Sequence, residues 1–197
     1  MSGSYLTNPL VFLIQTLFGL YILAVLLRFL LQTVRADFYN PISQFLVKVT
    51  NPPLKILRRF IPGFGGIDIA SLILAWLLKS VEILLILLVS GGVVNLIALL
   101  VWAIPELLDL LINIYLYGIL IQVILSWVSP GNYNPAVALL YSLTAPVLRP
   151  AQRLLPPMGG FDFSPMVVMI VLYLMGMLVV EPLRDLVNSP FARMNIL

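Results

Sequence analysis

The sequence has no cysteine and no histidine among its 197 residues. Without cysteine the chain forms no disulfide, holds no iron–sulfur cluster through thiolates and offers no thiol nucleophile. Without histidine it lacks the commonest metal ligand, the usual haem ligand and the usual general base. We therefore predict that the protein binds no metal and no cofactor.

Charge is scarce as well, because Asp, Glu, Lys and Arg make up only 10% of the chain, whereas a soluble domain carries about 25%. Hydrophobic residues account for 61%, and the mean hydropathy is +1.09. A chain with so little polar surface would precipitate from water. The composition therefore predicts a protein that lies in a lipid bilayer.

Common enzyme signatures are also missing from the sequence. It has no P-loop, no dinucleotide-binding glycine pattern and no Ser/His/Asp set. The carboxylates are too scattered along the chain to propose acid–base catalysis. We predict that the protein is not an enzyme.

Four segments are apolar and long enough to cross a bilayer, which requires about 20 residues. They are residues 9–31, 69–90, 106–128 and 163–182. A cleaved signal peptide would need a basic residue before the first of them, so we interpret that segment as a retained span. Residues 91–104 are apolar but short, and they begin with two glycines and stop at Pro105, which favours an interfacial or re-entrant segment.

The chain repeats itself at an offset of 94 residues. The Tyr-Asn-Pro of residues 39–41 returns at 133–135, and 12 of 33 positions are identical between residues 36–68 and 130–162. Several of these identities are Gly, Pro or Asp, which makes a chance match implausible. The sequence therefore predicts two tandem copies of one unit, each a span, a polar hairpin and a second span.

The two predicted repeats cover residues 1–102 and 103–197. The first contains the span 9–31, the hairpin 32–68, the span 69–90 and, at its end, the segment 91–104. The second contains the span 106–128, the hairpin 129–162, the span 163–182 and a polar tail. The predicted fold is an all-α polytopic membrane protein with four transmembrane helices, built as two pseudo-symmetric helical-hairpin repeats with short amphipathic helices on the cytoplasmic side.

Basic residues gather in the two hairpins and avoid the segment between the copies. Five lie in residues 32–68 and two in residues 129–162, whereas the intervening segment carries only Glu106 and Asp109. Because basic loops stay on the cytoplasmic side, we predict that both hairpins are cytoplasmic and both termini periplasmic. Arg184 and Arg193 in the tail weigh against this orientation without reversing it.

Within each hairpin, apolar residues recur at helical spacing after Pro41 and after Pro135. Pro52 and Pro146 are expected to end these short helices. An amphipathic helix with nearby bases lies well on an anionic lipid surface, where each base contributes about 1 kcal/mol. Two interpretations remain open: the helices only cap the bundle, or they bind anionic lipids or membrane-protein partners. Nothing in the sequence indicates nucleic acid as a direct partner.

Each hairpin ends in a Gly-Gly-x-Asp turn before the next span. Glycine allows backbone angles that other residues avoid, and Asp68 and Ser164 suit the N-cap of a helix. Arg59 precedes Asp68 by nine residues, and Arg153 precedes Asp162 by nine. This shared spacing predicts an arginine–carboxylate contact, within one copy or across the two, that closes the structure or serves a binding or gating role.

The repeated positions that we single out occur in both copies. They are Asn40, Pro41, Pro52, Arg59, Pro62, Gly65, Gly66 and Asp68 in the first copy, and Asn134, Pro135, Pro146, Arg149, Arg153, Pro156, Gly159, Gly160 and Asp162 in the second.

Among the polar residues inside the predicted spans we single out Arg28, Lys79, Glu82, Asn113 and Gln122. Lys79 and Glu82 are three residues apart, so they share a helix face and can pair. Arg28 either extends to the membrane surface or joins that pair. With Asn113 and Gln122 the set could line a polar seam. Contacts between helices, an ion or proton path and a charge that faces a partner all remain open.

The segments DFYNPISQFLVKVTNPPLKILRRFIP and APVLRPAQRLLPPMGGFDFSP resemble the YggT (YlmG) family of small integral membrane proteins. The resemblance covers most of residues 10–182 and rests on the repeated positions given above. The copies differ at Lys55, which corresponds to Arg149, and at residues 70–71, Ala-Ser, which correspond to Ser-Pro at 164–165.

This resemblance implies a protein of the bacterial inner membrane whose relatives have no agreed biochemical activity. Relatives are tied to osmotic stress and potassium uptake, to neighbourhoods of cell-division genes, and in plastids to cytochrome haem attachment or nucleoid distribution. Such divergent roles favour scaffolding over one shared reaction. We therefore predict a non-enzymatic scaffold or assembly and stress-related factor that binds lipids, other membrane proteins or itself. The alternative is an oligomeric cation channel or transporter component, linked to potassium.

Overall fold

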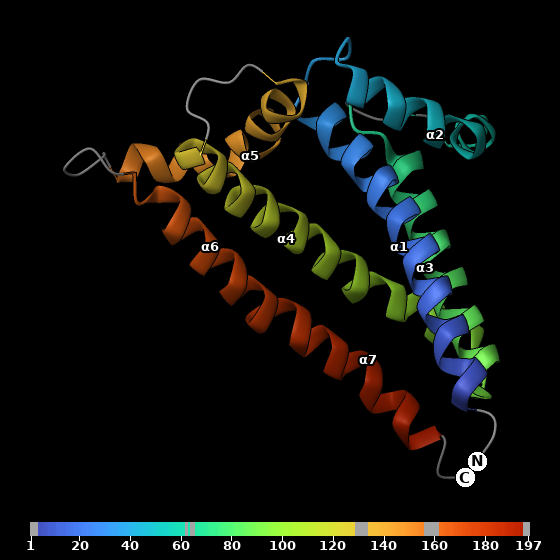
Figure 1. The fold of residues 1–197 in the computed structure, drawn as a ribbon. Coiled ribbons are helices and arrows are strands. Elements are labelled where there is room, and N and C mark those ends of the chain that lie inside the picture. Colours follow the sequence, from blue (N-terminus) through green and yellow to red (C-terminus); the bar gives the residue numbers. More distant parts are fainter. Residues whose placement is uncertain (1–3, 62, 64–65, 129–133, 156–161, 195–197) are drawn as a thin grey trace.

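The computed structural model describes residues 4–61, 63, 66–128, 134–155 and 162–194. They form α1 (Ser4–Thr33), α2 (Pro41–Leu57), α3 (Ile69–Ser90), α4 (Leu96–Val128), α5 (Pro135–Leu154), α6 (Ser164–Met175), the π-helix η1 (Gly176–Val180) and α7 (Glu181–Met194). Four stretches are long and apolar enough to cross a membrane: Thr7–Thr33, Ile69–Ser90, Leu96–Val128 and Ser164–Val187. The predicted all-α fold with four spans is thus confirmed (Figure 1).

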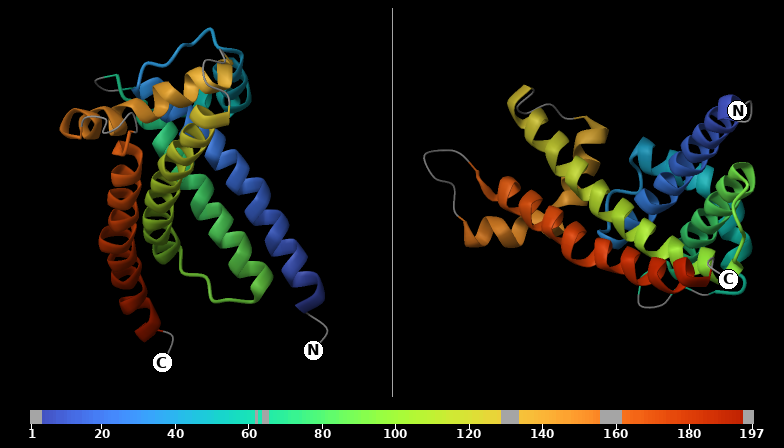
Figure 2. Two further views of the ribbon diagram at one scale, coloured as in Figure 1. Left: turned by 60° about the vertical axis from the view of Figure 1, so that its left-hand side comes forward. Right: turned by 90° about the horizontal axis from the view of Figure 1, so that it is seen from below.

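The spans are arranged as two hairpin units that share one orientation. Helix α1 packs along α3, and α4 packs against both α3 and α6. The shorter helices α2 and α5 lie together at one end of the spans and run across them, while both termini lie at the other end (Figures 1 and 2). Both hairpins therefore share one end of the molecule, as a parallel repeat requires.

Equivalent residues cap the two crosswise helices. The side chains of Asn40 and Asn134 accept hydrogen bonds of 2.9 Å from the backbone N–H groups of Ile42 and Ala136. A proline follows each asparagine, where its fixed φ suits the first turn and its missing N–H costs nothing. The repeated Asn-Pro is therefore a helix start.

The expectation that Pro52 and Pro146 end these helices is wrong. Helix α2 continues through Pro52 and Pro53 to Leu57, and α5 continues through Pro146 to Leu154. A proline inside a helix leaves one carbonyl without its partner. At Pro52 that carbonyl belongs to the exposed residue Lys48, where polar surroundings can satisfy it.

The start of α4 also differs from the expectation. Residues 96–104 do not form a separate segment, because α4 begins at Leu96 and runs on through Pro105. Asn95 caps this helix, and its Oδ1 accepts hydrogen bonds of 3.1 and 3.2 Å from the N–H groups of Ile97 and Ala98. With 33 residues the helix is about 50 Å long, which exceeds the ~30 Å of a bilayer core.

The chain after residue 182 is helical as well, rather than only a polar tail. Helices α6, η1 and α7 follow one another without a break as far as Met194. The π-helical turn at Gly176–Val180 is the one irregularity that the described part of this span contains. The last span is therefore longer than the hydropathy of the sequence alone predicts.

Two clusters of buried apolar residues form the core of the protein, one mainly in copy one and one in copy two. The first lies among α1, α2 and α3 and extends to Ile114 of α4 and Leu139 and Leu143 of α5. The second joins Ile119 of α4, Leu148 of α5, and Val168 and Leu172 of α6. Three of these four, Ile119, Leu148 and Val168, stand 94 positions after buried residues of the first cluster: Val25, Leu54 and Leu74. The repeat thus extends from the turn residues to the core.

One hydrogen bond joins the two crosswise helices directly and supplies a test. Asn40 Nδ2 donates to the carbonyl of Pro135 over 2.8 Å, and Asn40 is 6% exposed, whereas Asn134 is exposed. We expect Asn40→Ala to lower the free energy of unfolding by about 2 kcal/mol, from a lost cap and a lost buried hydrogen bond. Asn134→Ala loses only its cap, about 1 kcal/mol. Denaturant unfolding in detergent micelles measures both, and equal losses would mean that the bond between copies adds nothing.

Candidate functional site

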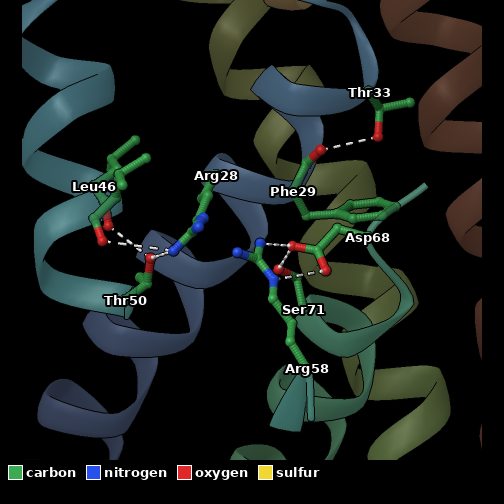
Figure 3. A network of polar contacts seen from close by, with 9 residues as sticks. Arg28, Phe29, Thr33, Leu46, Thr50, Arg58, Asp68 and Ser71 are labelled. Carbon is green, nitrogen blue, oxygen red and sulfur yellow. Dashed lines mark hydrogen bonds and ion pairs between the residues drawn. The ribbon is translucent and has the colours of Figure 1, made fainter. Parts of the chain in front are cut away.

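A buried carboxylate stands at the start of α3 and organises the end of copy one. Asp68 is 4% exposed. Its Oδ2 accepts from Nη2 of Arg58 and, over 2.6 Å, from Oγ of Ser71, while its Oδ1 accepts from Nε of Arg58 over 3.4 Å (Figure 3). Asp68 occupies the N-cap position but bonds no backbone N–H there, so its carboxylate serves the ion pair rather than the helix.

The predicted partner of this carboxylate was one residue off. Asp68 pairs with Arg58 and not with Arg59, which is exposed. In copy two, Asp162 Oδ2 accepts a 2.9 Å hydrogen bond from Nε2 of Gln152, not from Arg153. Successive side chains on a helix point about 100° apart, so equal spacing along the sequence could not choose between neighbours at the helix end. The offset of 94 nevertheless holds, because Gln152 is the counterpart of Arg58.

The surroundings of the two aspartates lower both pKa values. Burial raises the pKa of Asp68, but hydrogen bonds from Arg58 and Ser71 and the positive charges of Arg58 and Arg28 outweigh burial and bring it below its ordinary value of 3.8. Burial acts the same way on Asp162, and hydrogen bonds from Ser164 and Gln152 outweigh it. Both groups are therefore carboxylates at neutral pH.

A second repeated contact lies deeper in each copy. Arg28 of α1 is 7% exposed, and its Nη1 donates to Oγ1 of Thr50 over 2.7 Å and to the carbonyl of Val47 over 3.5 Å (Figure 3). In copy two, the hydroxyl of Thr144 donates to Oε1 of Gln122. These pairs are again 94 positions apart. Arg28 therefore neither joins Lys79 and Glu82 nor extends freely to the surface.

A cavity of about 690 Å³ opens beside these residues, between α1, α2 and the start of α3. We call it the copy-one cavity. Its charged lining residues are Arg28, Arg35, Arg58 and Asp68, and its polar ones include Gln32 and Asn51. Three positive charges thus face one negative charge in a recess at the hairpin end of the molecule.

Arg35 enters this lining in an unusual backbone conformation. Its φ of 53° lies in the left-handed region. The N–H of Arg35 bonds the carbonyl of Gln32 over 3.1 Å, and the N–H of Ala36 bonds that of Leu31 over 2.9 Å. This is the Schellman pattern that ends many helices, and glycine normally occupies the left-handed position. Gly66, with φ 85°, and Gly91, with φ 71°, take the same left-handed conformation, which glycine adopts without steric cost.

An equivalent cavity of about 720 Å³ occurs in copy two, with different chemistry. We call it the copy-two cavity. Gln122, Gln152 and Asp162 line it, at positions equivalent to Arg28, Arg58 and Asp68. Among the residues described there, no lysine or arginine lines the cavity. Both copies therefore have the cavity, but among the described residues arginines line it in copy one alone.

The remaining intramembrane charges form a separate site. Nζ of Lys79 lies 3.0 and 3.1 Å from the two carboxylate oxygens of Glu82, and the side chains are 17% and 5% exposed. The pair borders a cavity of about 330 Å³ that Trp102, Glu106 and Arg184 also line. The predicted pair is thus present.

The predicted polar seam, however, is wrong. Gln122 belongs to the copy-two cavity, and Arg28 belongs to the copy-one cavity. Asn113 is half-buried on α4 and lines neither of these cavities nor the one beside Lys79. Three helices, α1, α3 and α4, hold these polar groups at different positions along the spans, so the sequence alone could not show that they do not meet.

Arg184 makes contacts that the sequence analysis missed. It bonds Glu106 over 3.0 Å, Asp109 over 3.2 Å and Glu181 over 2.9 Å. Only Glu181 lies near it in sequence, three residues before. The sequence did contain one indication of these contacts. Glu106 and Asp109 lie at the start of a predicted span, where they need a base on a neighbouring helix.

The other repeated positions that the structure describes form no further cluster. Pro52, Arg149 and Arg153 are exposed on the crosswise helices. Pro62, Gly65, Pro156, Gly159 and Gly160 lie outside the described residues. Across the described ranges, no three Asp, Glu, His or Cys side chains gather closely enough to hold a metal ion.

Comparison with known proteins places this geometry in a family. The chain matches the CCB3/YggT family over residues 7–89 and again over 101–183, two matches that start 94 residues apart. An uncharacterized protein of Pseudomonas aeruginosa is 47% identical over 94% of this chain and 95% of its own. The uncharacterized protein YggT of Escherichia coli is 44% identical, over 90% and 92%. An uncharacterized protein of Haemophilus influenzae is 36% identical, over 88% and 92%. No solved structure matches the chain.

Proposed function

Because the chain belongs to the CCB3/YggT family, we propose that it is a non-enzymatic scaffold of the bacterial inner membrane. It binds anionic lipids and membrane-protein partners through the surface formed by α2 and α5, which we call the hairpin face. The observation that carries the proposal is the joint placement of these two helices across one end of the spans, linked by the hydrogen bond from Asn40 to the carbonyl of Pro135 (Figure 2).

The hairpin face combines exposed apolar and basic side chains. On α2 and its end the exposed side chains include Ile42, Phe45, Lys48, Lys55, Ile56, Arg59 and Phe60, and on α5 they include Tyr141, Arg149, Arg153 and Leu154. A helix with this composition lies in the interface between headgroups and acyl chains. Each base close to an anionic leaflet contributes about 1 kcal/mol. Six apolar side chains and five bases on one face favour contact with lipid headgroups over contact with water.

Charge at the opposite end supports a cytoplasmic orientation of the hairpin face. Arg184 was one of the two residues, with Arg193, that weighed against it, since a base near the termini belongs by rule on the cytoplasmic side. In the structure Glu106, Asp109 and Glu181 surround Arg184. Its charge is therefore compensated, whereas the bases of the hairpin face point outward.

The cation-transport alternative has one feature in its favour, the cavity beside Lys79 and Glu82. Its charged lining consists of Lys79, Glu82, Glu106 and Arg184, two of each sign. A balanced lining offers a cation no net attraction, whereas pores that conduct cations carry rings of backbone carbonyls or of acidic groups. The hairpin face is the stronger basis for a function.

Lipid retention by the purified protein tests this proposal. We expect native mass spectrometry to show more bound phosphatidylglycerol than phosphatidylcholine, because the exposed bases attract anionic headgroups. The variant Lys48→Gln/Lys55→Gln/Arg149→Gln/Arg153→Gln should lose most of that excess while its melting temperature stays near wild type. Potassium flux in liposomes provides the contrary outcome: flux that Glu82→Gln abolishes would overturn the proposal in favour of transport.

A further inference from the structure

We propose that the copy-one cavity is a binding site for a phosphate group, and that the copy-two cavity is not. This site is a bounded recess rather than the open hairpin face, and it does not depend on the scaffold role. Phosphate could arrive as a lipid headgroup or as a free ion, and the experiment below separates these sources.

The charge of the copy-one cavity is unbalanced. Asp68 is hydrogen-bonded to Arg58 and Ser71, and its single negative charge also acts on Arg28, so it cannot offset all three arginines of the lining. The four charged groups of the lining leave an excess of two positive charges. A phosphate monoester carries about −1.5 to −2 at neutral pH, and a phosphodiester carries −1. An anion of this class brings the cavity close to neutrality.

Arginine donors remain available for such an anion. Across the described residues, the hydrogen bonds of the Arg28 side chain use Nη1 alone, and those of Arg58 use Nε and Nη2. A guanidinium carries five N–H donors in a planar fork. Phosphate oxygens accept such forks in bidentate fashion, which is why arginine is favoured at phosphate sites. The free donors of Arg28 are especially apt, because that side chain is 7% exposed and buried charge requires a counter-charge.

The backbone conformation of Arg35 also supports a phosphate ligand. A non-glycine residue in the left-handed conformation costs roughly 1 kcal/mol, and glycine would avoid that cost at this helix end. Instead the position carries a base that lines the cavity. Strain of this kind is found where the surrounding structure or a ligand needs the side chain in place.

The size of the cavity accommodates more than the phosphate itself. Its volume of about 690 Å³ falls within the ~300–1,000 Å³ of small-molecule sites. The site therefore has room for an esterified phosphate, including the headgroup of a phospholipid. Its place at the end of the spans, where headgroups lie, suits that source.

Copy two provides a comparison within the same chain. The recess and the aspartate recur there, but glutamines stand at the positions of Arg28 and Arg58, as Gln122 and Gln152. Gln122 keeps the contact with Thr144, and Gln152 keeps the contact with Asp162. Glutamine at these positions is therefore compatible with the fold. What copy two lacks is the positive charge that neither contact requires.

The closing experiment exploits that comparison with the full chain in phosphatidylcholine nanodiscs. Isothermal titration with inorganic phosphate, and native mass spectrometry after doping with phosphatidylglycerol, provide the two arms. We expect saturable binding of one phosphate group per chain in at least one arm, and the arm identifies the source. Arg28→Gln/Arg58→Gln should weaken it at least about tenfold, since each charge-assisted hydrogen bond contributes about 1.5–3 kcal/mol. The matched control Gln122→Ala/Gln152→Ala changes the two equivalent positions of the copy-two cavity and should keep the affinity.

A third variant separates binding from folding. Arg35→Gly relieves the left-handed strain and removes one cavity charge, so it should raise the melting temperature while it weakens phosphate binding. Equal weakening in the Gln122→Ala/Gln152→Ala control would mean that the loss does not come from the copy-one cavity, and it would overturn the proposal. Absence of saturable binding by folded wild type in both arms would do the same. Neither result bears on the preference of the hairpin face for phosphatidylglycerol over phosphatidylcholine. That preference is measured with the quadruple variant of Lys48, Lys55, Arg149 and Arg153.

Discussion

Asp68→Asn should lower the free energy of unfolding by about 3 kcal/mol, far more than the same change at its counterpart Asp162. The carboxylate at position 68 is 4% exposed and holds Arg58 at the end of α2 and Ser71 in the first turn of α3. Removing one member of a buried ion pair costs about 3–5 kcal/mol, because the other charge stays buried without compensation. We expect the low end of that range, since Arg58 is 37% exposed and water screens part of its charge.

Asp162→Asn is the matched control for this prediction. Asp162 is exposed and accepts from a neutral amide, Gln152, rather than from a guanidinium. The expected loss is therefore below about 1 kcal/mol, the net contribution of an ordinary hydrogen bond. Unfolding titrations with SDS in mixed micelles measure both variants against wild type. Equal losses at the two positions would show that the aspartate stabilises only the local turn and that Arg58 adds nothing.

The pH dependence of unfolding provides a second readout of the same pair. The pKa of Asp68 is lower in the folded protein than its ordinary 3.8. A depressed carboxyl pKa contributes stability that is fully present above the ordinary value and is lost as the pH falls through the lower folded value. Wild type should therefore lose this increment below about pH 4, whereas D68N has none to lose. Parallel pH profiles would contradict the assignment.

Sequence reasoning reached the fold because its strongest signals do not depend on contacts. Apolar length alone identifies the spans, and the 94-residue offset identifies the copies, as the buried trio Ile119, Leu148 and Val168 confirms in the core. The parallel arrangement followed from where the bases lie. Boundaries were the weak point. Helix α4 begins earlier than expected, since Asn95 caps it and Pro105 does not stop it.

The candidate site was predicted in part, and the missing part is geometric. The repeated aspartate and a neighbouring arginine were visible in the sequence, yet the side chain that pairs is Arg58, one position from the identical Arg59. Arg59 and Arg153 are identical between the copies and were therefore predicted to make the contact, whereas the contact is made at the position where the copies differ. That difference, Arg58 against Gln152, is what distinguishes the two cavities. Conserved identity between repeats marks shared architecture here, and divergence marks chemistry.

The Lys79–Glu82 pair carries the second large prediction. Lys79→Met should lower the free energy of unfolding by about 3 kcal/mol, because it leaves the 5% exposed carboxylate of Glu82 without its cation. The double variant Lys79→Met/Glu82→Met should return to within about 1 kcal/mol of wild type, since apolar replacement of a whole buried pair is often neutral. Copy two supports this expectation, because Tyr173 and Gly176 occupy the equivalent positions.

A double-mutant cycle over Lys79 and Glu82 therefore decides what the pair is for. A coupling free energy of about 2 kcal/mol or more, with a stable double variant, means that the charges neutralise each other inside the span and that neither is needed to build the helix bundle. The proposed scaffold then keeps its lipid excess without them. A double variant as unstable as Lys79→Met would mean that the surrounding cavity, with Glu106 and Arg184 in its lining, requires charge at this depth. That result would contradict the architectural account and favour an ion-handling role for this half of the bundle.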